Sequence, residues 1–446
     1  MKEKQKQLSR KEKREMLDDA ARMEEMLQII QHYFPGLLAQ LKKVTDPRDK
    51  RYITYPIEVI LIVRILSALC AITSMRQLSE NFNHEICIEN IKRALNLDQL
   101  DELPYWETIN NCLKGVSSEE LKEVIYQMVT RLVRMRSFEA NRIQKRYWQV
   151  NVDGTQLYSF NQRHCENCLT REHKLADGTS RIEYYHSVLE AKLVLGKDLV
   201  ISIGSELIEN AEENPDKQDC ELKAFYRLEK KMKARFPKLP ICIVVDSLYA
   251  GEPFIKRCID NNWAYIIRFQ ERSIPSVTQE FGKLKALAPE NSLEITKDKT
   301  DYHYRWVNEI DYMDHKINEI ECLTKDKQFL FLTSIEVTKK NVEALTEAGR
   351  HRWYIENQGF NVQKNGGYAI EHVFCKDLQG LYNHYLVIQI AHTIEQLIYY
   401  ALYKEALSSM THQHLKEVIK YLFCSTLLRE NWMKRLNDPI RIRRPI

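Results

Sequence analysis

A carboxylate flanked by cations lies in the stretch Arg350–Lys364. If this stretch is helical, Arg352, Glu356 and Lys364 share one side, because residues three and four apart lie on the same helix face. An acid that can bind a metal ion, beside cations that can bind phosphate, is what phosphoryl transfer on nucleic acid requires. An isolated Arg/Glu pair four residues apart is more often a surface ion pair. The interpretation therefore depends on whether other acids join Glu356.

Two further acids stand at the ends of apolar segments. Asp153 follows Trp148–Val152, and Asp246 follows Ile241–Val245, a continuous apolar run typical of a strand buried on both faces. Carboxylates at the ends of adjacent strands can converge at one edge of an open α/β sheet. A divalent cation would relieve their repulsion, and such oxygen ligands suit Mg²⁺ or Mn²⁺. Two ions about 3.5–4 Å apart can activate an attacking hydroxyl and stabilise a leaving oxygen.

Each of these acids also has a purely structural interpretation. Asp153 precedes Gly154 and would suit a turn, while Asp246 would suit the cap of a following helix. Taken singly, the two interpretations are evenly matched. Taken together with Arg352 and Glu356, the strand-end acids favour a metal site.

Two cysteines, Cys165 and Cys168, lie between the first two expected strands, close to His164, His173 and His186. A C-x-x-C pair can be half of a zinc site, and Cys165, Cys168, His173 and His186 would supply four ligands. Their spacing matches no standard zinc finger, so reduced thiols in a stiff loop are the alternative. The eleven scattered cysteines indicate a reducing, cytosolic environment.

Strands and helices alternate around the acids. The pattern becomes strand-like at Tyr147 and then follows the order β-β-β-α-β-α-β, which predicts a three-layer α/β architecture. The expected elements cover 148–154, 184–195, 199–207, 220–236, 241–246, 253–261 and 264–269. Three strand patterns at 302–312, 316–323 and 329–333 predict a β-rich insertion over 271–335. The catalytic core would therefore occupy 141–270 and resume over 336–377, where a helix leads to Glu356.

Both ends of the chain are predicted to be helical. Residues 1–140 show helical patterns, including one that begins with Ser74 as its cap, and would form either a DNA-binding unit or a plain helical bundle. Residues 378–446 are helical and end in a basic tail. The net charge is only +4, so local basic runs must carry any nucleic-acid contact. The most apolar segment, 57–72, is too short for a comfortable membrane span, and we expect no membrane partner.

The sequence resembles the DDE transposases of bacterial insertion sequences. The matching segments are Val152–Thr155, Val245–Tyr249, Arg352–Trp353, Ile355–Asn357, Gly359–Asn361, Gln363–Asn365, Gly367–Tyr368 and Glu371–His372. The long interval between Asp246 and Glu356 fits the sub-group with a β-rich insertion before the third acid. The commonest third signature has a tyrosine three residues before the arginine and a lysine seven after the glutamate. This chain has Gly349 and Gln363 there, with Lys364 adjacent.

This resemblance implies a ribonuclease-H-like mixed sheet flanked by helices. It also implies a transposase that cleaves insertion-sequence ends and joins them to target DNA by metal-dependent phosphoryl transfer. Asp153, Asp246 and Glu356 would hold Mg²⁺ or Mn²⁺, as two ions. Arg352 and Lys364 would bind backbone phosphates. Trp353 would either stack on an unpaired base or pack in the core.

The partners implied by the resemblance are double-stranded DNA, as terminal inverted repeats and target, and a second copy of the chain in a synaptic homodimer. The expected location is the bacterial cytoplasm, on the nucleoid when the protein is bound to DNA. One alternative is a nuclease that cuts without strand transfer. The other is an inactive or domesticated DNA-binding protein, against which the three acids argue, because binding alone does not need them.

Overall fold

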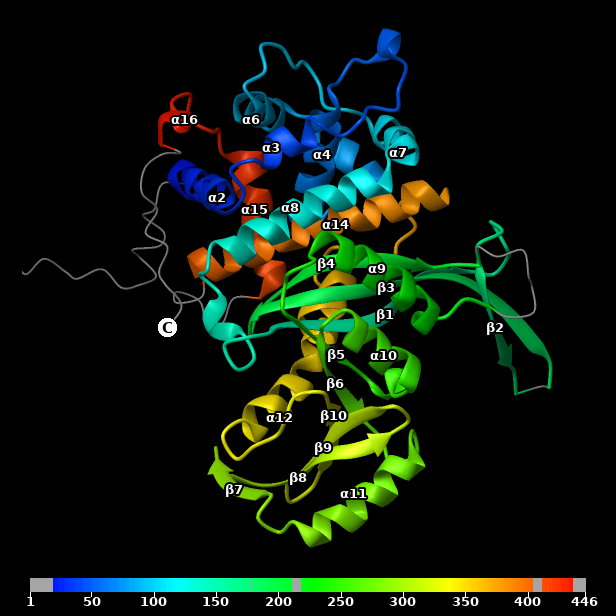
Figure 1. Ribbon diagram of the computed structural model, residues 1–446. Helices are drawn as coiled ribbons and strands as arrows, with labels where there is room; N and C mark the ends of the chain where they lie inside the picture. Colours follow the sequence, from blue (N-terminus) through cyan, green and yellow to red (C-terminus); the bar gives the residue numbers. More distant parts are fainter. Residues whose placement is uncertain (1–18, 177, 211–217, 404–410, 436–446) are drawn as a thin grey trace, which may run out of the picture. The chain divides into compact units, whose positions relative to one another are not determined.

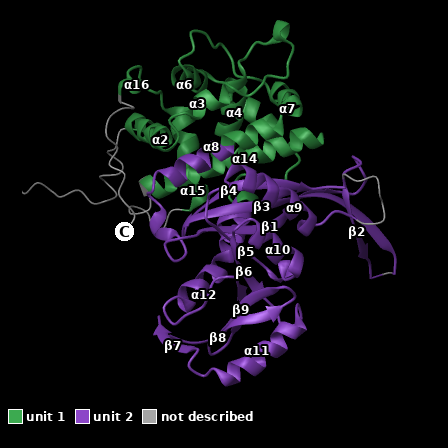
Figure 2. Ribbon diagram, in the orientation of Figure 1, with its two compact units in different colours: residues 1–124, 363–446 green, residues 125–362 purple. Residues whose placement is uncertain are grey.

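The computed structural model describes residues 19–176, 178–210, 218–403 and 411–435 (Figure 1). The chain divides into two compact units (Figure 2). Unit 1 comprises residues 1–124 and 363–446, and unit 2 comprises residues 125–362. The N-terminal and C-terminal helices therefore belong to one unit, although they are far apart in the sequence.

Unit 2 is built on one mixed sheet of ten strands (Figure 1). The strands are β1 (Trp148–Phe160), β2 (Leu169–Lys174), β3 (Ser180–Gly196), β4 (Leu199–Ile208), β5 (Ile241–Val245), β6 (Ala264–Phe269), β7 (Ser292–Lys297), β8 (Thr300–Tyr312), β9 (His315–Leu323) and β10 (Gln328–Thr333). The order is β2-β3-β1-β5-β6-β10-β9-β8-β7, and β4 also pairs with β3. β3 is antiparallel to β1 and β4, whereas β5 and β6 continue parallel to β1. The series β4-β3-β1-β5-β6 is a ribonuclease-H-like core, which confirms the expected fold class.

Helices cover both faces of this core. Phe254 of α10 contacts the ring of Tyr265 in β6. Leu345 of α12 packs in a buried cluster with Val244 and Ile266. Tyr265 and Ile266 are consecutive strand residues and point to opposite faces, so α10 and α12 lie on opposite sides of the sheet. This confirms the three-layer architecture. The helices of unit 2 are α9 (Glu221–Arg235), α10 (Glu252–Asp260), α11 (Pro275–Leu287) and α12 (Val342–Arg350), preceded by most of α8 (Ser118–Arg134).

Several boundaries differ from the sequence prediction. β1 continues to Phe160 instead of ending beside Gly154, and β2 and α11 were not predicted. β2 was missed because its residues are mostly polar and exposed, without a buried alternation. The insertion contains the three predicted strands and also β7. It continues the core sheet, because β10 pairs antiparallel with β6.

Unit 1 is helical and centred on α14, whose residues are almost all buried. The apolar helix α4 packs against α14 and contains the buried Arg64. Its Nε atom donates a hydrogen bond to His384 at 2.9 Å, which explains how a cation is accommodated there. The predicted cap is confirmed, since Ser74 Oγ accepts from the backbone N–H of Gln77. The helices of unit 1 are α2 (Asp19–Tyr33), α3 (Leu37–Leu41), α4 (Ile57–Leu69), α5 (Met75–Phe82), α6 (Glu85–Leu95), α7 (Trp106–Gly115), α13 (Asn361–Asn365), α14 (Leu378–Ile398), α15 (His412–Ser425) and α16 (Trp432–Arg435), with α13 beginning two residues before the boundary.

No helix in the described ranges combines the length and apolar character needed to cross a membrane. The predicted helical start at residues 1–18 and the basic tail with Arg441, Arg443 and Arg444 lie outside the described residues.

Candidate active site

Arg352 joins two of the predicted acids. Its Nη1 atom lies 2.9 Å from Oδ2 of Asp153, and its Nη2 atom lies 2.9 Å from Oε1 of Glu356. The Arg352 side chain is 13% exposed and that of Glu356 is 40% exposed, so the site is more accessible at Glu356. One guanidinium therefore brings together a carboxylate from β1 and a carboxylate from the helical segment that follows α12.

Asp246 directly follows β5, on the strand beside Asp153. β5 runs parallel to β1, with Val244 opposite Asn151. Asp246 comes two residues after Val244 and Asp153 comes two residues after Asn151, so the two aspartates lie at the same level of neighbouring strands. The Asp246 carboxylate also accepts a hydrogen bond from the backbone N–H of Leu248 at 2.9 Å. Asp246 therefore caps the short helix Ser247–Tyr249 and also lies beside Asp153 at the acidic site. Within the described residues, the three acids are not gathered so closely that their oxygens all lie within 4.8 Å of one another.

A row of polar side chains on β1 fixes the helical segment that carries the third acid. Gln149, Asn151 and Asp153 alternate along the strand and therefore project from one face. Gln149 Nε2 donates to the carbonyl of Ala348 at 3.0 Å, and Asn151 Nδ2 donates to that of His351 at 2.7 Å. The segment passes here from α-helix to 3₁₀-helix and then to π-helix. Side chains of β1 therefore add hydrogen bonds to carbonyls of this irregular segment and fix its position on the strand.

The site holds more negative than positive charge. Burial raises the pKa of Asp153 to about 6, and the charges of Glu356 and Asp246 add to this against the opposing effect of Arg352. Burial, together with Asp153 and Asp246, raises the pKa of Glu221 to about 7. The negative charges of this site therefore raise the pKa of both Asp153 and Glu221, against the effect of the Arg352 guanidinium. A divalent cation would relieve this excess of charge, so the oxygen donors fit Mg²⁺ or Mn²⁺.

Glu221, the first residue of α9, belongs to this acidic group and was not predicted. Its carboxyl group lies against Gly154, where the Cβ of any other residue would overlap it. Gly154 is therefore explained by a close approach rather than by a turn. The glycine after Asp153 was a signal of this approach, but the sequence does not reveal which distant side chain makes it.

The aromatic residues next to Arg352 differ in their surroundings. Trp353 is 56% exposed, and its ring centroid lies 5.8 Å from the guanidinium carbon of Arg352. Tyr354 instead stacks on the ring of His351, with centroids 4.4 Å apart. Of the two, Trp353 has the exposed ring that stacking on a base would need.

Lys364 belongs to unit 1, where its Nζ atom lies 2.8 Å from Glu371. The preceding residue, Gln363, stands where the commonest signature has lysine. Gln363 is fully buried and its Nε2 atom donates to Gln389 at 2.8 Å. Glutamine suits this position because an amide can be satisfied in a buried polar contact more readily than a charged ammonium group.

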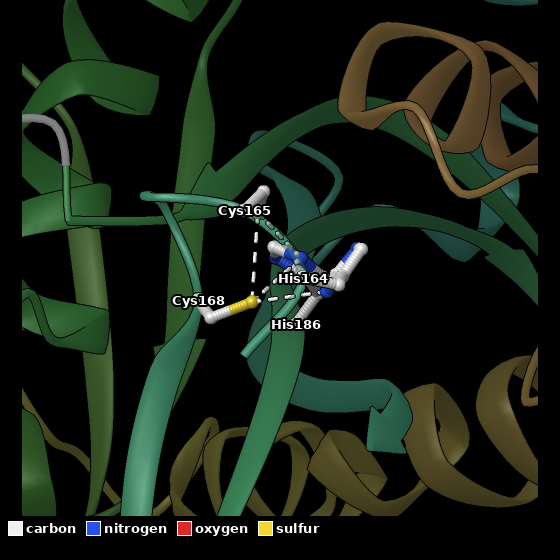
Figure 3. Close-up of side chains that lie close together, drawn as sticks. All are labelled: His164, Cys165, Cys168 and His186. Atoms are coloured by element: carbon white, nitrogen blue, oxygen red, sulfur yellow. Dashed lines mark hydrogen bonds between the residues drawn. The ribbon is translucent and has the colours of Figure 1, made fainter. Parts of the chain in front are cut away.

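A second group of potential ligands lies at the loop between β1 and β2 (Figure 3). It contains His164, Cys165, Cys168 and His186. His173, predicted as a ligand, lies instead on β2 with its Nε2 atom 2.7 Å from Glu183. Of the four predicted ligands, the group therefore contains Cys165, Cys168 and His186 but not His173. His164 takes that place because the loop folds back on itself, whereas β2 carries His173 away.

The core sheet, with acids on β1, after β5 and on the helical segment after the insertion, defines a ribonuclease-H-like protein with an acidic site. Two protein-family models match the chain, "DDE_Tnp_1-associated" over residues 38–129 and "Transposase DDE domain" over residues 218–394. These two matches indicate a DDE-type transposase. Asp246 and Glu356 lie within the second match, whereas Asp153 lies between the two.

A solved structure described as a cryo-EM structure of the piggyBac transposase synaptic complex with hairpin DNA is similar at 12% sequence identity and a TM-score of 0.40. The similarity covers 93% of this chain and 82% of that one. Among curated proteins, no match was found.

Proposed function

We propose that this protein is the transposase of a bacterial insertion sequence, which cleaves the element's ends and joins them to target DNA by a cut-and-paste reaction. The observation that carries this proposal is the contact of Arg352 with both Asp153 and Glu356, next to Asp246 and Glu221. The match of residues 218–394 to the transposase DDE domain supports it.

Asp153, Asp246 and Glu356 would hold Mg²⁺ or Mn²⁺. When bound, such ions activate an attacking hydroxyl and stabilise a leaving oxygen. Arg352 orients the carboxylates of Asp153 and Glu356, and its guanidinium has further N–H donors for a backbone phosphate. Trp353, exposed beside it, is suited to stacking on an unpaired base.

The proposed partner is double-stranded DNA, first as the terminal inverted repeats and then as target, in the bacterial cytoplasm. Lys364 would add a phosphate contact. Because both ends of the element must be processed together, we infer that two copies of the chain act in one synaptic complex.

The test uses DNA that carries the inverted repeats flanking the gene. Asp153→Asn, Asp246→Asn and Glu356→Gln are each expected to reduce end cleavage by about 10²-fold or more, with DNA binding in a gel-shift assay unchanged. Asp260→Asn, an exposed acid at the end of α10, is the matched control. Full cleavage by any one active-site variant would remove that acid from the proposed site. Cleavage by the wild type without joining to target DNA would instead favour a nuclease.

A further inference from the structure

Four sulfur and nitrogen ligand atoms converge outside the acidic site (Figure 3). The Sγ atoms of Cys165 and Cys168 are 3.5 Å apart. Nε2 of His186 lies 3.4 Å from Cys165 Sγ and 3.7 Å from Cys168 Sγ. Nδ1 of His164 lies 3.1 Å from Cys168 Sγ. All four ligand atoms lie within 4.8 Å of one another.

These separations are close to those around a tetrahedral zinc ion. Zinc–sulfur bonds of about 2.3 Å and zinc–nitrogen bonds of about 2.0–2.1 Å place neighbouring ligand atoms about 3.3–3.8 Å apart. Ordinary hydrogen bonds account poorly for the arrangement. A thiol donates only one hydrogen bond and its sulfur is a weak acceptor, whereas Cys168 Sγ has three such neighbours.

The chain builds this group from the loop after β1 and from one residue of β3. His164, Cys165 and Cys168 lie in the loop, and Cys168 immediately precedes β2. His186 lies on β3 opposite Tyr158 of β1, just after the register shift in this pair of strands. Cys168 and His186 are fully buried, and the other two residues are partly buried. The loop is therefore held over β3 at the point where the β2–β3 hairpin leaves the core sheet.

We propose that His164, Cys165, Cys168 and His186 bind one structural Zn²⁺, which anchors the β2–β3 hairpin to the core. The two thiols lose their protons to solvent when the ion binds. Four protein ligands close the coordination shell, as in structural zinc sites, and leave no position for substrate. Sulfur and nitrogen ligands select zinc, whereas the carboxylates around Asp153 suit a harder cation, so the two metals would occupy separate sites.

Zinc content measured by elemental analysis on the full-length chain, purified without chelator, tests this proposal. About one equivalent per chain is expected in the wild type and below about a tenth in Cys165→Ser/Cys168→Ser. His173→Ala is the matched control, because this histidine lies in the same region but pairs with Glu183, and it should keep the zinc. Cys87→Ser/Cys424→Ser should also keep it. Cys87 and Cys424 belong to a different group of potential ligands, which they form with His84 and which offers three ligands rather than four.

Cobalt substitution of the wild type gives a readout that does not depend on the folding of a variant. Tetrahedral Co²⁺ with two thiolates should show intense visible bands and a sulfur-to-cobalt charge-transfer band. Wild-type protein without zinc and without this cobalt spectrum would overturn the proposal. So would zinc that persists in Cys165→Ser/Cys168→Ser or disappears only in Cys87→Ser/Cys424→Ser. Neither measurement requires DNA cleavage, so each is independent of the proposed transposase activity.

Discussion

The side chains of Arg352 and Asp153 lie 2.9 Å apart, although the residues are separated by 199 positions in the sequence. The same guanidinium also contacts Glu356. It supplies positive charge to the carboxylates that we propose as metal ligands. A divalent cation would supply charge of the same sign to the same oxygens. The stability of this part of the fold should therefore depend on both the arginine and the metal.

Replacing Arg352 with alanine should destabilise the protein more in the absence of Mg²⁺ than in its presence. Without the guanidinium, Asp153 and Glu356 have no cation between them, at a cost of about 2 kcal/mol, less than for a fully buried pair because Glu356 is 40% exposed. Mg²⁺ should restore part of this loss. Thermal unfolding in EDTA and in Mg²⁺ measures the difference. Arg257→Ala, which breaks the pair with Glu229, is the control and should lose the same stability in EDTA as in Mg²⁺. If Arg352→Ala also loses the same stability in the two conditions, Arg352 and the metal do not act on the same carboxylates.

Glu221→Gln should raise the Mg²⁺ concentration needed for half-maximal cleavage by about tenfold, because one negative charge is removed from beside the proposed ligands. The maximal rate should return at saturating Mg²⁺. Glu252→Gln is a close control, since both residues are acids in the first turn of a helix. Glu252 is not among the groups that perturb the pKa of Asp153 or of Glu221. An unchanged Mg²⁺ requirement in Glu221→Gln would exclude Glu221 from the site.

Gly154→Ala should displace the Glu221 carboxyl group and so increase the Mg²⁺ requirement in the same way. The new Cβ would overlap the end of the Glu221 side chain, which can move, and we expect a stability loss at the low end of overpacking, about 1 kcal/mol. Removing the glutamate as well, in Gly154→Ala/Glu221→Ala, should recover part of that stability, as a double-mutant cycle would measure. Gly196→Ala, where the added methyl group meets open space, is the control. Additive losses in the cycle would contradict the predicted contact.

Glu319→Gln should stabilise the β-rich insertion, most of all at alkaline pH. Burial, with the charge of Glu321, raises the pKa of Glu319 to about 8, and neither carboxyl oxygen has a hydrogen-bond partner within the described part of the chain. The folded state binds this proton more tightly than the unfolded state, whose glutamate has a pKa near 4.5. The carboxyl group therefore favours folding at low pH, and this stability is lost as pH rises from about 4.5 to about 8.

The gain from Glu319→Gln should reach about 4 kcal/mol at pH 8 and shrink to about 1 kcal/mol at pH 5, since glutamine does not titrate. Melting temperatures across this range measure it. Glu290→Gln, which changes an exposed acid just before β7, is the matched control for the loss of a surface carboxylate. A variant as pH-dependent as the wild type would show that Glu319 is not the responsible group.

Much of the core could be predicted because its signals are local. The apolar run that became β5 is buried at every position, as a central parallel strand requires. Ser74 was recognisable as a cap from its own position. β2 was missed because its mostly exposed residues carry no apolar alternation. The sequence pattern predicts the end of β1 at Gly154, because glycine often bounds a strand, whereas the strand continues and the glycine provides room for Glu221.

The sequence by itself determined the types and order of the three acids and the arginine, since each stands beside a local strand or helix pattern. Tertiary structure decided which side chains meet. The register of β1 on β3 brings His186 to the loop cysteines, and the packing of α9 brings Glu221 to Asp153. Such contacts depend on strand register and on helix packing between segments that are far apart in the chain. Residue spacing cannot specify them, because the intervening chain can follow many paths.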